Sequence, residues 1–183
     1  MSGPGGARVL VAGVGNVLRG DDGFGPAVVE ALEAEGLPPG AHAVEVGIGG
    51  MSLLLELMEC YDALVVVDAV ARDGEPGTLY VLDPDVPPAA DVPEAARAGL
   101  ADVHELVPDR MLVLARVLGV LPPRVRIVGC EPARPEELTI ELTPPVSAAV
   151  PRAVAAVRSL VAETVGGGVA EPPLERRQEP PRA

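Results

Sequence analysis

The sequence contains few aromatic residues, few cysteines and no long hydrophobic run. Aromatic residues make up 2% of the 183 residues and Trp is absent, so the core must consist of Val, Leu, Ala and Ile. The two cysteines, Cys60 and Cys130, are too few for a disulfide framework. The sequence shows no run of the ~18 apolar residues that a membrane span requires, and its start lacks the pattern of a signal peptide. These absences predict a cytoplasmic protein without a membrane partner.

Basic residues are also scarce. The chain has 14 Lys and Arg against 27 Asp and Glu, which gives a formal net charge of −13. A nucleic-acid-binding protein needs a basic face, so nucleic acid is not an expected partner. Hydrophobic residues make up 48% of the chain, which is enough for a compact core. We expect one α/β domain over residues 1–165 and a disordered tail over residues 166–183, where Gly, Pro, Glu and Arg predominate.

Apolar segments of strand length alternate with segments of helical periodicity. Strands are expected at residues 8–12, 43–46, 63–70, 78–82 and 125–130. Helices are expected at residues 24–35, 51–60, 108–118 and 147–164, with a loop at residues 83–99. This alternation predicts a three-layer α/β fold with a twisted, mostly parallel sheet of about five strands and helices on both faces. The strand at residues 78–82 follows a Pro-Gly turn and is a candidate for an antiparallel edge strand.

One acidic residue interrupts the most apolar segment of the chain. Residues 63–70, ALVVVDAV, are apolar except for Asp68 and should form a central strand covered on both faces. A buried carboxylate is costly unless it is hydrogen-bonded, paired, protonated or bound to a metal. Asp68 therefore either accepts hydrogen bonds from nearby backbone N–H groups at the strand end or belongs to a functional site.

A glycine-rich segment, GVGNVLRGDDGFG, follows the first strand at residues 13–25. It supplies two glycines of the dinucleotide-binding fingerprint, but Leu18 occupies the third position and residues 19–23 delay the helix. A nucleotide-binding oxidoreductase is thus only a weak alternative. The segment instead carries Asp21 and Asp22, which either cap the following helix or present a carboxylate at the carboxyl edge of the sheet.

A histidine, His104, follows the loop that is expected after the fourth strand. In a parallel sheet ligands bind outside the carboxyl ends of the strands, and Asp22, Asp68 and His104 are all expected there. Two carboxylates and an imidazole suit a divalent transition metal, and they also suit acid–base chemistry on an amide. His42 is interpreted as a surface residue, and both cysteines as packing residues.

The glycine-rich segment resembles the N-terminal signature of the hydrogenase maturation endopeptidases. The matching residues are Gly13-Val14-Gly15-Asn16, Leu18, Gly20-Asp21-Asp22-Gly23 and Gly25. The resemblance covers residues 8–161. It continues through Gly49-Gly50-Met51, Val67-Asp68-Ala69, Pro76-Gly77-Thr78, His104, Gly129 and Leu142-Thr143-Pro144.

This resemblance implies a peptidase that removes the C-terminal extension of a nickel-loaded large-subunit precursor of nickel–iron hydrogenase. It assigns Asp22, Asp68 and His104 as the catalytic, metal-contacting residues, with Asp21 as the second choice for the first position. The nickel would come from the precursor, and no tightly bound organic cofactor is expected. Two departures from the family pattern, Ile48 and residues 105–109, concern specificity.

The alternatives differ in chemistry. A non-catalytic checkpoint would bind the nickel-loaded precursor without cutting it. For a peptidase, either the metal or a carboxylate acting as general base would activate water. The sequence has neither a serine nucleophile elbow nor an HExxH motif, so the serine and zinc protease mechanisms have no support.

Overall fold

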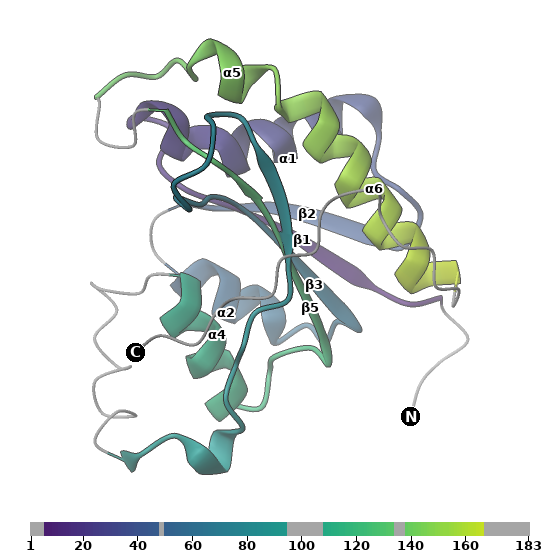
Figure 1. Ribbon diagram of the computed structural model, residues 1–183. Helices are drawn as coiled ribbons and strands as arrows, with labels where there is room; N and C mark the ends of the chain where they lie inside the picture. The colour runs from purple at the N-terminus through teal and green to yellow at the C-terminus, as the bar shows by residue number, and fades with distance from the viewer. Residues whose placement is uncertain (1–5, 48–49, 95–107, 134–137, 167–183) are drawn as a thin grey trace.

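A five-stranded sheet between two layers of helices forms the body of the protein (Figure 1). The computed structural model describes residues 6–47, 50–94, 108–133 and 138–166. The strand order is β2-β1-β3-β5-β4. The strands are β1 Val9–Val14, β2 Ala41–Gly47, β3 Ala63–Ala69, β4 Leu79–Leu82 and β5 Arg124–Cys130. This arrangement confirms the expected three-layer α/β fold.

Four strands are parallel, and the short edge strand β4 runs antiparallel to β5. The turn before β4 places Gly77 at φ +81°, and its N–H donates to the carbonyl of Glu131 at 2.8 Å. The tight turn returns the chain alongside β5, as its Pro-Gly sequence predicts. The parallel strands end at a common edge of the sheet, which we call the carboxyl edge.

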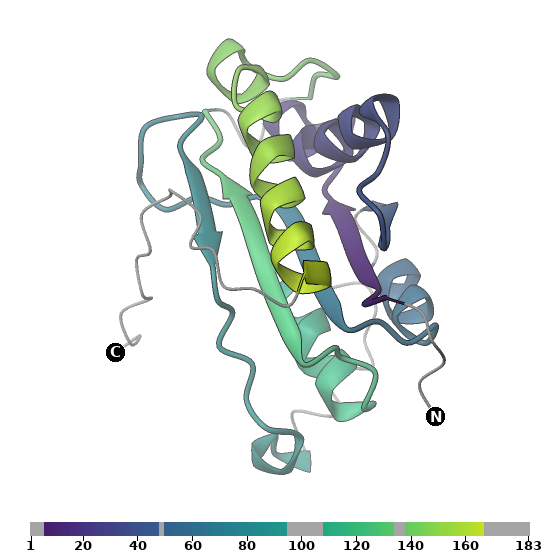
Figure 2. The same cartoon turned by 90° about the vertical axis from the view of Figure 1, so that its right-hand side faces the viewer.

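Helices cover both faces of the sheet (Figures 1 and 2). α1 (Phe24–Glu35) and α6 (Val150–Gly166) cover one face, and α2 (Met51–Leu57) and α4 (Pro108–Val117) cover the other. Shorter helical segments are η1 Gly20–Gly23, η2 Ala89–Asp91 and α5 Pro144–Ser147.

Some helix ends differ from the expected ones. α2 stops at Leu57, and Cys60 lies beyond it with φ +60°, a left-handed conformation that cannot continue a helix. The last helix begins at Val150, not at residue 147. Pro151 then lies in its first turn, where its missing N–H costs no hydrogen bond.

Two hydrophobic clusters hold the layers together, one on each face of the sheet. Phe24, Val28 and Leu32 of α1 pack on one face with Val157 and Val161 of α6. On the other face the cluster includes Leu53 and Leu57 of α2 and Met111 and Leu112 of α4. Residues of β1 and β3 contribute alternately to the two clusters, which explains the apolar sequence of β1 and of β3 up to Val67.

The segment Pro144–Gly166 has the length and the mean hydropathy, 1.2, of a membrane-spanning helix. In the structure it comprises α5 and α6, and 44% of its most apolar window is buried. Val154, Val157, Leu160 and Val161 belong to the hydrophobic cluster beneath α1 and α6. Packing on the sheet therefore accounts for these apolar residues of α6.

Candidate functional site

The glycines after β1 permit close contacts between backbones. A Cβ atom on Gly25 would collide with the carbonyl oxygens of Val14 and Val67, at the ends of β1 and β3. Gly15 has φ +132°, and a Cβ there would collide with the carbonyl of Asp22. Because these two positions carry no side chain, η1 and the start of α1 pack closely against the carboxyl edge. The glycine-rich segment therefore places the two aspartates at the carboxyl edge.

Asp21 is completely buried and binds to a distant segment. Its Oδ1 accepts a hydrogen bond from the Thr143 N–H at 2.7 Å. Its Oδ2 accepts hydrogen bonds from the Thr143 hydroxyl at 2.9 Å and the Ala133 N–H at 2.8 Å. Asp21 thus joins η1 to the two chain segments that follow β5, a structural role that the sequence alone did not indicate.

Asp22, the adjacent residue, has a different environment. It is half-buried, and its Oδ2 accepts a hydrogen bond from the Asn16 N–H at 3.0 Å. The Asn16 side chain in turn accepts from the Leu18 N–H at 3.0 Å, which stabilises the turn. This hydrogen bond links the Asp22 carboxylate to the turn after β1, in contrast to a helix-capping interaction with α1.

Asp68 lies near the end of β3, where the strand emerges from the core. Val66 and Val67 are fully buried, whereas Asp68 is half-buried. Its Oδ1 accepts a hydrogen bond from the Ala69 N–H at 2.8 Å, as the first of the two interpretations proposed. Because η1 packs beside β3, the structure brings Asp22 and Asp68 to the same edge from two adjacent segments.

The third predicted residue, His104, lies outside the described residues, as do Ile48 and residues 105–107. Among the residues that the structure describes, no group of three or more His, Cys, Asp or Glu side chains could hold a metal ion. A three-residue metal contact by Asp22, Asp68 and His104 therefore stays a prediction.

A buried carboxylate at the same edge, Glu131, was missed in the sequence. It follows β5, is 5% exposed and accepts hydrogen bonds from the Arg72 N–H at 2.9 Å and the Tyr80 hydroxyl at 2.9 Å. Burial and this hydrogen bond raise the pKa of Tyr80. Glu131 thereby fixes the loop after β3. Its position directly after the expected strand at residues 125–130 could have indicated a buried carboxylate at the carboxyl edge.

Neither cysteine is placed as a nucleophile at this edge. Cys130 is buried at the end of β5, and burial, followed by the negative charge of Asp21, raises its pKa to about 12. Such a thiol stays protonated at neutral pH, in agreement with the packing role that was expected. Cys60 is exposed, and its carbonyl accepts a hydrogen bond from Arg8, which precedes β1 at the opposite edge of the sheet.

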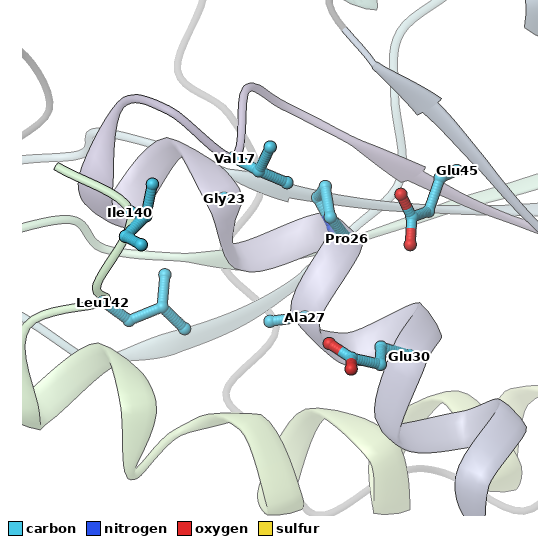
Figure 3. A pocket seen from close by; sticks show the side chains of 8 residues that line it. All are labelled: Val17, Gly23, Pro26, Ala27, Glu30, Glu45, Ile140 and Leu142. Atoms are coloured by element: carbon cyan, nitrogen blue, oxygen red, sulfur yellow. The ribbon is translucent and has the colours of Figure 1, made fainter. Parts of the chain in front are cut away.

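An open pocket of about 310 Å³ adjoins the turn that carries Asp22 (Figure 3). Its lining comes from the β1–α1 segment, α1, β2 and the segment before α5. The lining residues are Val17, Gly23, Pro26, Ala27, Glu30, Glu45, Ile140 and Leu142. Because Gly23 follows Asp22 directly, the pocket lies next to the segment that carries Asp22.

Comparison with known proteins assigns the chain to a family. The profile of the hydrogenase maturation protease family matches residues 26–160. The hydrogenase expression/formation protein HupD of Rhodobacter capsulatus is 35% identical over 179 residues, which cover 92% of this chain and 82% of HupD. The hydrogenase 2 maturation protease of Escherichia coli is 34% identical over 161 residues, covering 86% of this chain and 92% of that protein.

Solved structures agree with this assignment. The hydrogenase maturating endopeptidase HybD from E. coli superposes with a TM-score of 0.64 at 32% identity, covering 85% of this chain and 93% of HybD. The hydrogenase 2 maturation peptidase from Thaumarchaeota archaeon SCGC_AB-539-E09 gives a TM-score of 0.60 at 35% identity, with 84% and 97% coverage. The chain belongs to the hydrogenase maturation protease family and is a peptidase.

Proposed function

We propose that this peptidase removes the C-terminal extension of a nickel-loaded large-subunit precursor of nickel–iron hydrogenase, in the cytoplasm. The observation that carries the proposal is the placement of Asp22 and Asp68. Both carboxylates are half-buried at the carboxyl edge, on segments that pack against each other. Carboxylates in this position suit a cation that is presented by the substrate.

The proposed role of Asp22, Asp68 and His104 is to contact nickel that the precursor already holds. These contacts would position the scissile peptide bond against the edge, and such positioning lowers a reaction barrier substantially. Water then adds to the carbonyl carbon, the C–N bond breaks and the leaving amine takes up a proton. Nickel or one of the carboxylates would activate the water.

The hydrogen bonds of the two aspartates favour these roles. The Asn16 N–H binds Oδ2 of Asp22, and the Ala69 N–H binds Oδ1 of Asp68. A hydrogen bond from a backbone N–H stabilises the charged carboxylate and limits its rotation. In this arrangement the backbone holds each carboxylate in one orientation, as contact with a cation requires.

The proposed partner is therefore the large-subunit precursor, with its nickel as part of the substrate. We propose no organic cofactor, nucleic acid or membrane for the reaction. The excess of acidic residues, 27 against 14 basic ones, disfavours a polyanionic partner.

Mass spectrometry of the precursor C-terminus tests this function. The wild-type protein should shorten the nickel-loaded precursor at one peptide bond. Asp68→Asn should abolish cleavage and keep the fold, because the two side chains have nearly the same size. Asp73→Asn is a matched control, because Asp73 is exposed in the loop after β3 and the charge change is the same. Binding without cleavage by the wild type would instead support a checkpoint protein.

A further inference from the structure

The pocket beside Asp22 has two chemically different ends. Val17, Ile140 and Leu142 lie at one end, and Glu30 and Glu45 lie at the other (Figure 3). Pro26 and Ala27 form the wall between them.

The apolar end is open to solvent. Val17 is 51% exposed and Ile140 is 76% exposed, so an apolar group of a bound partner can cover both side chains. Its wall is nevertheless anchored. The Gly20 N–H donates to the Thr139 carbonyl at 2.5 Å, and Thr143 binds Asp21 on the other side of Ile140 and Leu142. The exposed apolar surface is thus held in a fixed position.

The acidic end comes from two elements. Glu30 belongs to α1 and Glu45 to β2, and both side chains are exposed. In the described part of the chain, neither carboxylate has a hydrogen-bond or ion-pair partner. Two uncompensated negative charges at one end of the pocket favour a positively charged group.

We propose that this pocket binds an arginine or lysine side chain of the precursor, close to the scissile bond. The aliphatic stem of the side chain would lie along Pro26 and Ala27, and its charged head would bind Glu30 and Glu45. A neighbouring apolar residue of the precursor covers Val17 and Ile140. This inference rests on the proposed function and makes Glu30 and Glu45 specificity-determining residues.

The location of the pocket connects it to the reaction. Gly23 lines the pocket and directly follows Asp22. A precursor residue that occupies the pocket would therefore lie near the turn that carries Asp22.

Cleavage kinetics of the nickel-loaded precursor test the proposal. The double variant Glu30→Gln/Glu45→Gln should lower kcat/KM about 10-fold, mainly through a higher KM, because two charge-assisted contacts are lost. The control variant Glu33→Gln/Glu94→Gln removes two exposed charges outside the pocket and should stay within about 2-fold of wild type.

Changes in the precursor identify the bound residue. Each Arg or Lys near the scissile bond is replaced singly by Gln. One replacement should lower kcat/KM about 10-fold with the wild-type protein and have no further effect with Glu30→Gln/Glu45→Gln, since interacting groups are not additive. Equal losses with both proteins at every position would overturn the proposal. The proposal would also be overturned if Glu30→Gln/Glu45→Gln had the same kcat/KM as the control variant. A purely apolar residue in the pocket would give that second result.

Precursor binding separates this inference from the proposed function. If the wild-type protein binds the precursor without cleaving it, the proposed cleavage fails. The proposal for the pocket is then supported if Glu30→Gln/Glu45→Gln binds the precursor about 10-fold more weakly than Glu33→Gln/Glu94→Gln. It is overturned if the two variants bind the precursor equally.

Discussion

Asp21 and Thr143 lie 122 residues apart in sequence, and Thr143 donates two hydrogen bonds to the buried Asp21 carboxylate. The backbone N–H of Thr143 binds Oδ1 and its hydroxyl binds Oδ2. This contact joins the turn after β1 to the segment before α5. It also holds in place the apolar wall of the pocket, because Ile140 and Leu142 belong to that segment.

We predict that Asp21→Asn lowers the free energy of unfolding by about 3 kcal/mol. The carboxylate accepts at least three hydrogen bonds in a buried site, and hydrogen bonds to charged groups are worth about 1.5–3 kcal/mol each. The amide of Asn would direct N–H groups at one or more of these donors. Urea unfolding gives the measurement, with Asp22→Asn as the control.

Asp22→Asn should lower the free energy of unfolding by about 1 kcal/mol or less. Asp22 is half-buried, and the amide oxygen of the new Asn can still accept a hydrogen bond from the Asn16 N–H. The opposite order of the two stabilities would contradict the structural role assigned to Asp21.

Gly25→Ala should destabilise the protein strongly, by several kcal/mol, or prevent folding. Its Cβ would lie within the contact distance of the carbonyl oxygens of Val14 and Val67, and neither strand end can move freely. Gly166→Ala is the control, because nothing lies within 4 Å of a Cβ at that position. Thermal unfolding compares the two variants, and a similar Tm for both would refute the close-packing argument.

The two cysteines should differ in reactivity with a maleimide at neutral pH. Cys60 is exposed and should react quickly. Cys130 is buried, its pKa is raised to about 12, and it should react only after unfolding. Cys60→Ser should therefore remove nearly all labelling of the native protein, as read by mass spectrometry. Rapid labelling of that variant would show that Cys130 is accessible.

Tyr61 should ionise at unusually high pH. Burial, followed by the hydrogen bond to Glu56, raises its pKa from 10.0 to about 12. Because the folded state binds this proton more tightly than the unfolded state, the contribution to stability is present below pH 10 and is lost as pH rises to about 12. Tyrosinate absorbance in the Tyr80→Phe variant follows Tyr61 alone. A midpoint near 10 would contradict the buried environment.

The sequence predicted the fold well because its main signals are local. Apolar runs marked the central parallel strands β1 and β3, and the Pro-Gly turn marked the antiparallel edge strand β4. Helix ends were less accurate. The left-handed conformation of Cys60 and the separation of α5 from α6 depend on packing that periodicity does not record.

The environments of the acidic residues were harder to predict. Asp68 was recognised because it interrupts an apolar strand, and Glu131 was missed although it directly follows one. The resemblance ranked Asp22 ahead of Asp21 for the site, but the sequence did not indicate a different role for Asp21. The tertiary structure separates their roles. Thr143 and Ala133 donate hydrogen bonds to Asp21, whereas Asn16 donates to Asp22.

The proposed nickel dependence rests on where the metal comes from. The candidate contacts are two carboxylates and one imidazole on separate segments, without a thiolate. Such a set is suited to completing the coordination of a nickel ion that the precursor already holds. Cleavage would then require that nickel has already been inserted into the precursor. The isolated protein should contain little nickel.

The most direct measurement is mass spectrometry of the precursor C-terminus after incubation with this protein, with and without nickel in the precursor. The nickel-loaded precursor should be shortened at one bond. The metal-free precursor, in the presence of a strong chelator, should remain at full length. Efficient cleavage of the metal-free precursor at the correct bond would contradict nickel recognition and leave Asp22 and Asp68 as an acid–base pair.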